Sequence, residues 1–169
     1  ELLISDIAIM LAGGITVPSY ITYTEKDYEF IIDDCEPTII IVSIQILFNK
    51  LKDVIPKKKF IKKIVLFDEI KKNILSDQII ELKNILSSTL NFDENNPIIN
   101  LNRKDPACII YTSGTEGNPK GVVLSHGGIL SNCEGAINLI KPILSSRTRF
   151  LTWLPLSHSY EHTVQFVQI

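Results

Sequence analysis

Apolar residues along the chain follow two alternating patterns, one with helical spacing and one in short continuous runs. Leu3, Ile7 and Met10 recur every three or four positions, which predicts a helix that ends at the small residues 12–14. Residues 15–20 then form a short strand or extended segment at Pro18. A second helix, over residues 24–34 with Thr24 as its N-cap, follows from the same spacing at Tyr28, Ile31, Ile32 and Cys35.

The short apolar runs predict strands. The run TIIIV at residues 38–42 is β-branched and apolar on both faces, as in parallel strands that are buried between layers of helices. Runs of the same kind predict further strands at residues 63–67, 107–111, 121–125 and 149–153.

Helical spacing returns between these strands, and residues 91–105 form a polar loop. Because strands and helices alternate, we predict an α/β fold with a layered, largely parallel sheet and flanking helices. The helices are expected through Leu47, Leu51 and Val54; through Leu75, Ile79, Leu82 and Leu86; from an N-cap at Ser125 through Leu130, Cys133, Ile137 and Ile140; and after residue 158.

Composition narrows the class of protein. With 45% hydrophobic residues, 21% charged residues and a formal net charge of −2, the chain has no basic excess that would favour nucleic acid. The longest apolar run, residues 39–48, is far shorter than the roughly 20 residues of a membrane-spanning helix. The three cysteines lack metal-type spacing, which favours buried thiols in a reducing compartment. Lysines 57–59, 62 and 63 are interpreted as a solvated turn rather than a lipid contact.

The stretch YTSGTEGNPKGVVLSH, residues 111–126, carries the chemistry. Glycine allows backbone N–H groups to converge on an anion, and hydroxyls and a lysine add donors and charge that suit phosphate. A proline next to the lysine stiffens the chain. The stretch therefore predicts a polyphosphate site built from Gly114, Gly117 and Gly121, from Thr112, Ser113 and Thr115, and from Pro119 and Lys120.

Two other interpretations of this stretch fit its sequence less well. A Walker A loop would need glycine at position 119 and Ser or Thr at position 121, where the chain has Pro119 and Gly121, and the segment that follows is strand-like rather than helical. A hairpin connection without a ligand would usually be shorter and would not need three hydroxyls and a lysine. We therefore favour a phosphate-binding loop between two strands.

The motif YTSGTEGNPKGV resembles the phosphate-binding signature of the adenylate-forming enzymes, the acyl-CoA synthetase superfamily, usually written [YF]TSG[ST]TGxPKGV. Glu116 departs from the usual Thr or Ser. Residues 11–42 are similar to the family's upstream segment. Residues 150–162, FLTWLPLSHSYEH, look like its later LPLxH segment, particularly in long-chain fatty acyl-CoA synthetases. These landmarks cover nearly the whole chain in the family's order.

The resemblance implies an ATP-dependent enzyme that activates a carboxylic acid, here a long-chain fatty acid, as an acyl-adenylate and transfers the acyl group to coenzyme A. It assigns Lys120 and His158 as catalytic residues, with His158 beside the reacting carboxylate, and Thr115 as a contact of the Mg²⁺ that ATP brings. Acetate, medium-chain acids, aryl acids and amino acids remain open as substrates. The phosphate-binding residues are Thr112, Ser113, Gly114, Thr115, Glu116, Gly117 and Lys120.

The same resemblance implies where the chain belongs. We expect residues 1–169 to be part of the large N-terminal AMP-binding domain of a longer cytoplasmic enzyme. Its partners are then the small molecules ATP, fatty acid and CoA, with peripheral membrane contact because fatty acids reside there. We expect no catalysis by this part alone.

Two alternatives belong to other classes of protein. HSYEH also spells H-x-x-E-H, which on a helix would let His158 and His162 bind zinc with Glu161 as general base, as in a peptidase. Against it, Pro155 precedes the first histidine closely, and no later acidic residue supplies a third ligand. The other alternative is a nucleotide-binding module without catalysis, which the length of the intact protein would distinguish.

Overall fold

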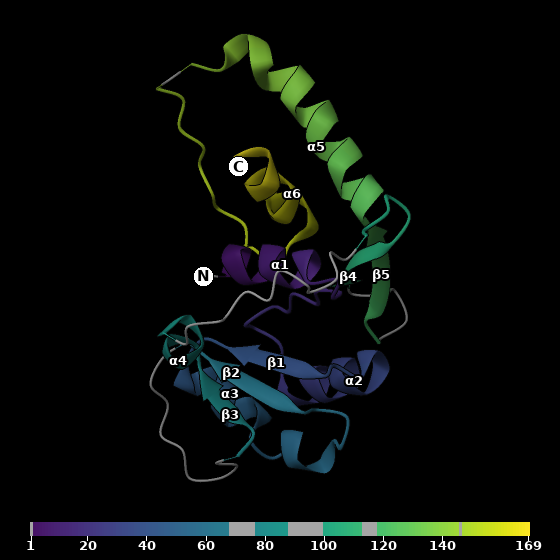
Figure 1. The fold of residues 1–169 in the computed structure, drawn as a ribbon, viewed down its shortest axis with the longest axis vertical. Coiled ribbons are helices and arrows are strands. Elements are labelled where there is room, and N and C mark those ends of the chain that lie inside the picture. Colours follow the sequence, from purple (N-terminus) through teal and green to yellow (C-terminus); the bar gives the residue numbers. More distant parts are fainter. Residues whose placement is uncertain (1, 68–76, 88–99, 113–117, 146) are drawn as a thin grey trace. The chain divides into compact units, whose positions relative to one another are not determined.

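A computed structural model describes residues 2–67, 77–87, 100–112, 118–145 and 147–169 (Figure 1). The chain divides into two compact units, one of residues 1–20 and 97–169 and the other of residues 21–96. Each unit combines helices with strands, as the alternating pattern predicted. Among the described residues no helix is both long and apolar enough to cross a membrane.

The unit of residues 21–96 contains a parallel sheet in the order β1–β2–β3 (Figure 1). Its strands are β1 (Ile39–Val42), β2 (Lys63–Leu66) and β3 (Ile79–Glu81). The prediction of a parallel sheet with flanking helices is confirmed here. The helices are α2 (Glu25–Cys35), α3 (Gln45–Leu51), the 3₁₀ turn η1 (Ile55–Lys57) and α4 (Leu82–Ser87).

Helix α2 begins where the sequence predicted. The Thr24 side chain accepts the backbone N–H of Asp27, and the Asp27 carboxylate accepts the backbone N–H of Thr24, so that two amides of the first turn are satisfied reciprocally. The hydrogen bonds from the side chain and backbone of Thr24 lower the pKa of Asp27. The helix ends at Glu36, which adopts the left-handed conformation.

One core holds this unit together. Val42, Ile64 and Leu66 of the sheet pack with Phe48 and Leu51 of α3. Since Ile64 and Leu66 are fully buried in the middle strand, that strand is covered on the face that meets the helices. The remaining buried members are Tyr28, Ile32, Val54, Ile55 and Ile61.

The predicted helix through Leu75, Ile79, Leu82 and Leu86 is wrong in its middle. Ile79 lies in strand β3 and pairs with Ile64, and α4 begins only at Leu82. Strand β2 has one edge against β1, and residues 79–81 supply the partner that its other edge needs, which outweighs helical spacing. Leu75 lies outside the described residues.

One lysine of the cluster, Lys58, is partly buried and forms ion pairs. Lys58 lies between Asp33, at 2.5 Å, and Glu29, at 3.7 Å, both on α2. The hydrogen bond to Asp33 raises the pKa of Lys58. The other lysines of the cluster, Lys57, Lys59, Lys62 and Lys63, are exposed, as expected of a solvated turn.

The unit of residues 1–20 and 97–169 is built on an antiparallel pair of strands, β4 (Pro106–Thr112) and β5 (Lys120–Ser125). Thr16 forms a parallel bridge to Cys108 on the other side of β4, so the extended segment after the first helix joins the pair at one residue. In Figure 1, α6 lies beside the long helix α5. The helices are α1 (Leu2–Leu11), α5 (His126–Ile140), the 3₁₀ turn η2 (Lys141–Ile143) and α6 (Ser159–Val167).

The core of this unit joins α1, β4 and α5. Met10, Ala107, Cys108, Ile110, Ile129 and Cys133 are buried together. Met10 and Cys133 are positions that helical spacing assigned to the inner faces of their helices, so those two predictions are confirmed.

The predicted strand at residues 149–153 is wrong. These residues are assigned no strand, and Leu151 and Trp153 are 83% and 73% exposed. A strand requires a neighbour that satisfies its backbone N–H and C=O groups, and no described strand lies along this segment. Aromatic and apolar side chains alone therefore do not make a strand here.

The buried thiol of Cys108 is expected to make the folded protein less stable at alkaline pH. Burial raises the pKa of Cys108 from 9.0 to about 11, and the Asp6 carboxylate acts in the same direction. The unfolded chain loses this proton first, so the contribution of Cys108 is complete below pH 9 and is lost as the pH rises to about 11, a loss of about 2–3 kcal/mol.

Urea unfolding at about pH 8 and about pH 10.5 measures this effect. We expect the free energy of unfolding of the Cys108→Ala variant to fall less between the two pH values than that of the wild type. An equal fall in both proteins would contradict the raised pKa, because lysines and tyrosines titrate in this range in both.

Candidate active site

The motif lies where two strands meet at the end of a hairpin. In the register of β4 and β5, Thr112 faces Lys120 and Tyr111 faces Gly121. The Thr112 hydroxyl lies 3.5 Å from the carbonyl oxygen of Lys120, which it can donate to. The two strands thus hold both ends of the connection at a defined separation.

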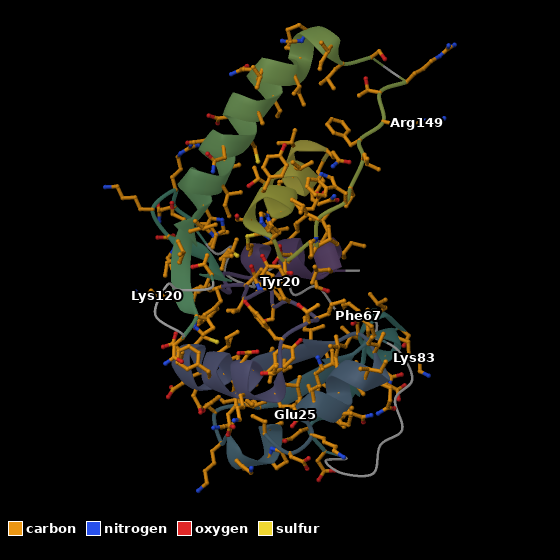
Figure 2. All side chains as sticks on the ribbon, turned by 180° about the vertical axis from the view of Figure 1, so that it is seen from behind. Tyr20, Glu25, Phe67, Lys83, Lys120 and Arg149 are labelled. Carbon is orange, nitrogen blue, oxygen red and sulfur yellow. The ribbon has the colours of Figure 1, made fainter. Side chains whose placement is uncertain are left out.

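The predicted phosphate loop itself is described only at its ends. Ser113, Gly114, Thr115, Glu116 and Gly117 lie outside the described residues, so their assignment stays a prediction. Thr112 and Lys120 are both exposed, and Lys120 is labelled in Figure 2. Within the described part of the chain no carboxylate lies at ion-pair distance from Lys120. Its ammonium group is thus available to an anion at the hairpin end.

Gly121 has a packing role that the sequence did not reveal. A Cβ placed there would lie 3.0 Å from Ile109 Cγ2 and 3.2 Å from Cζ of the Tyr111 ring. Since Tyr111 is buried, its ring cannot readily move away. Glycine at this position lets the aromatic residue at the start of the motif pack across the strand pair, next to Lys120.

The start of α5 is not an anion site. The backbone N–H of His126 donates to the carbonyl oxygen of Asp105, and that of Gly127 donates to the carbonyl oxygen of Arg103. The backbone N–H of Gly128 donates to the Ser125 hydroxyl oxygen. Ser125 is the N-cap, as predicted. Because these amides already have protein partners, the helix does not offer them to phosphate as the helix of a P-loop does. This agrees with the exclusion of a Walker A loop.

His158 is held at the start of α6. It is the N-cap residue, and its Nδ1 accepts the backbone N–H of Tyr160 at 3.2 Å. The backbone N–H of His158 donates to the carbonyl oxygen of Pro155. A ring whose Nδ1 accepts a hydrogen bond carries its proton on Nε2 when neutral. His158 can therefore present an Nε2–H donor to a carboxylate oxygen.

The zinc alternative has no support from the arrangement of its residues. His162 Nε2 is bonded to Asp6, Glu161 Oε1 accepts from Gln165, and His158 Nδ1 caps the helix. The described ranges contain no group of three His, Cys, Asp or Glu side chains that could hold a metal ion. The two histidines and the glutamate of the H-x-x-E-H motif each have a partner within the protein instead.

An apolar groove lies on the helices of the same unit. Its volume is about 450 Å³, in the range of small-molecule sites. The polar groups on its wall are His126, Glu134 and the thiol of Cys133. The other lining residues are apolar: Ile7, Met10 and Leu11 of α1; Ile129, Leu130 and Ile137 of α5; Leu101, which precedes β4; and Phe166 and Ile169 at the C-terminal end.

A family model described as "AMP-binding enzyme" matches residues 1–168. The chain belongs to this family. The resemblance in the motif is therefore confirmed over nearly the whole sequence.

Relatives of the AMP-binding chain include long-chain acyl-CoA synthetases. It is 30% identical to Long chain acyl-CoA synthetase 3 of Arabidopsis thaliana over 98% of its own length and 26% of the relative's. It is 31% identical to Long-chain-fatty-acid–CoA ligase ACSBG2 of Xenopus laevis over 94% of its length and 22% of the relative's. The chain thus spans about a quarter of the length of these relatives.

Solved structures show the same fold. ATP-bound MatB from Rhodopseudomonas palustris matches 99% of the AMP-binding chain and 30% of its own, with a TM-score of 0.73 and 20% identity. Coronafacic Acid Ligase from Pectobacterium brasiliense matches 98% of this chain and 31% of its own, with the same TM-score and identity. The α/β fold predicted from the sequence is that of adenylate-forming ligases.

Among the predicted site residues, the structure brings Thr112 and Lys120 together and places His158 apart from them in the sequence, as the N-cap of α6. The pairing of His162 with Asp6 was missed. A signal for it was present, because Asp6 lies on the helix face of Leu3 and Met10, where an acidic residue needs a partner.

Proposed function

We propose that this chain belongs to an enzyme that activates a long-chain fatty acid with ATP and transfers it to coenzyme A. A carboxylate oxygen attacks the α-phosphorus of ATP, pyrophosphate leaves, and the CoA thiol then displaces AMP to form the thioester. The observation that carries the proposal is the hairpin that sets Thr112 opposite Lys120 at the ends of a motif of the AMP-binding family.

The proposed site residues have three different roles, which are phosphate binding, contact with Mg²⁺ and orientation of the carboxylate. Lys120 and the loop from Thr112 would bind the β- and γ-phosphates, which align pyrophosphate as a leaving group. Thr115 is the proposed contact of the Mg²⁺ that accompanies ATP, and Mg²⁺ would neutralise phosphate charge. The Nε2–H of His158 would orient the carboxylate or stabilise charge as the bond to phosphorus forms.

The substrate class rests on two observations. The relatives include proteins named long-chain acyl-CoA synthetases, and the groove on α1 and α5 is lined mainly by apolar side chains. A long alkyl chain gains from leaving water, whereas acetate has little apolar surface to bury. Since fatty acids partition into membranes, we propose a cytoplasmic enzyme with peripheral membrane contact.

The domain assignment is part of the same proposal. Relatives are about four times as long as this chain, so we propose that residues 1–169 form part of the large N-terminal AMP-binding domain. Catalysis requires groups held together around the reacting carboxylate. We therefore propose that residues 1–169 alone bind polyphosphate weakly and form no acyl-adenylate.

The test is exchange of labelled pyrophosphate into ATP by the full-length protein, with Mg²⁺ and saturated acids from acetate to a long-chain acid. We expect exchange that depends on both the acid and Mg²⁺ and has its highest kcat/KM with long chains. Residues 1–169 alone are expected to give none. Preference for acetate would refute the substrate class, and turnover by residues 1–169 would refute the domain assignment.

A further inference from the structure

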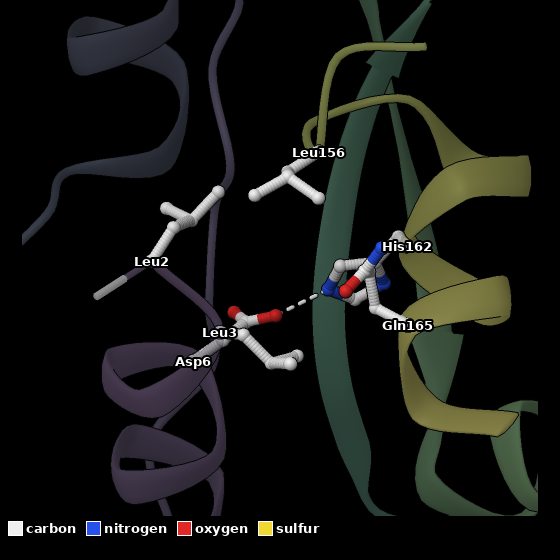
Figure 3. Close-up of a pocket in the computed structure, with 6 residues that line it drawn as sticks. All are labelled: Leu2, Leu3, Asp6, Leu156, His162 and Gln165. Carbon is white, nitrogen blue, oxygen red and sulfur yellow. Dashed lines mark hydrogen bonds and ion pairs between the residues drawn. The ribbon is translucent and has the colours of Figure 1, made fainter. Parts of the chain in front are cut away.

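A buried polar pair connects the first and last helices of the unit that contains the motif. Asp6 Oδ2 of α1 and Nε2 of His162 on α6 are bonded to each other, although the two residues are 156 positions apart (Figure 3). The side chains are only 6% and 4% exposed. We call these two residues the Asp6–His162 pair.

Apart from Gln165, whose amide bonds to Glu161 and Thr152, the side chains around the pair are apolar and closely packed. Leu2, Leu3 and Leu156 line a cavity of only about 10 Å³ beside it, at the lower limit for one water molecule (Figure 3). The rings of Phe166 and His162 lie nearly perpendicular to each other at a centroid distance of 4.7 Å. With so little room for water, each member of the pair depends on the other as its hydrogen-bonding partner.

Stability alone is a weak reason for such a pair. A buried polar pair often contributes no more than apolar residues of similar volume would, because removal from water offsets the attraction. What the pair does supply is direction, since a hydrogen bond weakens steeply away from linearity. The position of the His162 ring relative to α1 is therefore closely defined.

The turn that carries His162 also carries His158. The backbone N–H of His162 donates to the carbonyl oxygen of His158 at 2.9 Å, and His158 Nδ1 accepts from Tyr160 within the same turn. The Gln165 amide, next to the pair, donates to Glu161 and to the Thr152 hydroxyl and holds the preceding segment. A shift of His162 would therefore move His158.

We propose that the Asp6–His162 pair is a positioning device for His158: it fixes the first turn of α6 against α1 and thereby the direction of the His158 Nε2–H. This inference rests on the proposed function, in which His158 lies beside the reacting carboxylate. Asp6 and His162 themselves touch no substrate and act through His158.

Kinetics of the full-length enzyme separate this role from a general loss of structure. Asp6→Asn keeps the size of the side chain and removes its charge, and we expect kcat for acyl-adenylate formation to fall about tenfold or more with KM for ATP nearly unchanged. Combined with His158→Ala, it should cause no further loss, since the group it positions is gone. If the loss of kcat in the double variant equalled the product of the two single losses, the proposal would be overturned.

Two further variants control the experiment. His162→Gln retains a donor for Asp6 and is expected to keep more of kcat than His162→Ala, and equal losses would count against positioning. Asp33→Asn removes the carboxylate of the ion pair with Lys58 in the other unit, and it should leave kcat unchanged. If Asp6→Asn does not fold, the two His162 variants carry the test.

A second measurement does not depend on the reaction. In ¹⁵N NMR spectra, Asp6→Asn should shift the Tyr160 amide and the His158 Nδ1 signal and speed exchange of that amide, while the matched Asp33→Asn spectrum keeps both. An undisturbed Tyr160 amide in Asp6→Asn would overturn positioning. Absence of acid-dependent exchange in the wild type would instead refute the proposed function, and the spectra would still decide whether Asp6 holds the turn of His158.

Discussion

Replacement of Lys120 by alanine is expected to lower kcat/KM for ATP in acid-dependent pyrophosphate exchange about 10- to 150-fold. The change removes one charge-assisted hydrogen bond to phosphate, worth about 1.5–3 kcal/mol. Lys120 is exposed at the first position of β5, and its backbone faces Thr112, so its loss should leave the strand pair intact. Steady-state exchange kinetics over a range of ATP concentrations measure the effect.

Lys104→Ala is the matched control, since Lys104 is also an exposed lysine of the same unit but lies outside the motif. It should exchange pyrophosphate at the wild-type rate. Lys120→Arg keeps the charge with a different geometry and should fall between wild type and alanine. Wild-type exchange and ATP KM in Lys120→Ala would show that Lys120 does not contact phosphate.

Truncation of Ile64 to alanine is expected to destabilise the unit of residues 21–96 by about 2–5 kcal/mol. Ile64 has no exposed surface, and its strand β2 lies between β1 and β3, so the cavity left behind has little freedom to collapse. Urea unfolding followed by far-UV circular dichroism gives the change in free energy.

Graded replacements distinguish burial from side-chain chemistry. Ile64→Val removes one methylene group and should cost about 0.5–1.5 kcal/mol. Ile46, on α3, is 68% exposed, and Ile46→Ala should change stability by no more than about 0.5 kcal/mol. Equal effects at positions 64 and 46 would mean that the buried core of this unit is not where the structure places it.

Local patterns along the chain determined most of the helices and the first strands. Helix α2 begins after Thr24 because the Thr24 hydroxyl and the Asp27 carboxylate each accept the backbone N–H of the other residue. This interaction involves only residues that are close in the sequence. Strand β1 follows from a β-branched run that is too short for a helix. Such features depend on neighbours in the chain, and sequence therefore reveals them.

The motif could also be recognised from the sequence. Glycines, hydroxyls and Lys120 within a few residues predicted a phosphate loop, and the resemblance of the motif led to the family whose model matches residues 1–168. Its chemistry depends on residue types at fixed short spacing. The packing of the Tyr111 ring against Gly121 could not be predicted from the sequence. The two residues lie on different strands, and only the folded hairpin defines their register.

The sequence by itself determined the α/β class, the N-caps of α2 and α5, and the position of the motif between two strands. Only the tertiary structure decided that residues 79–81 form a strand that pairs with β2, that residues 149–153 form none, and that His162 is bonded to Asp6. The physical reason is the same in each case. A strand edge or a buried polar side chain takes its state from a partner far away in the chain, and spacing along the sequence carries no record of that partner.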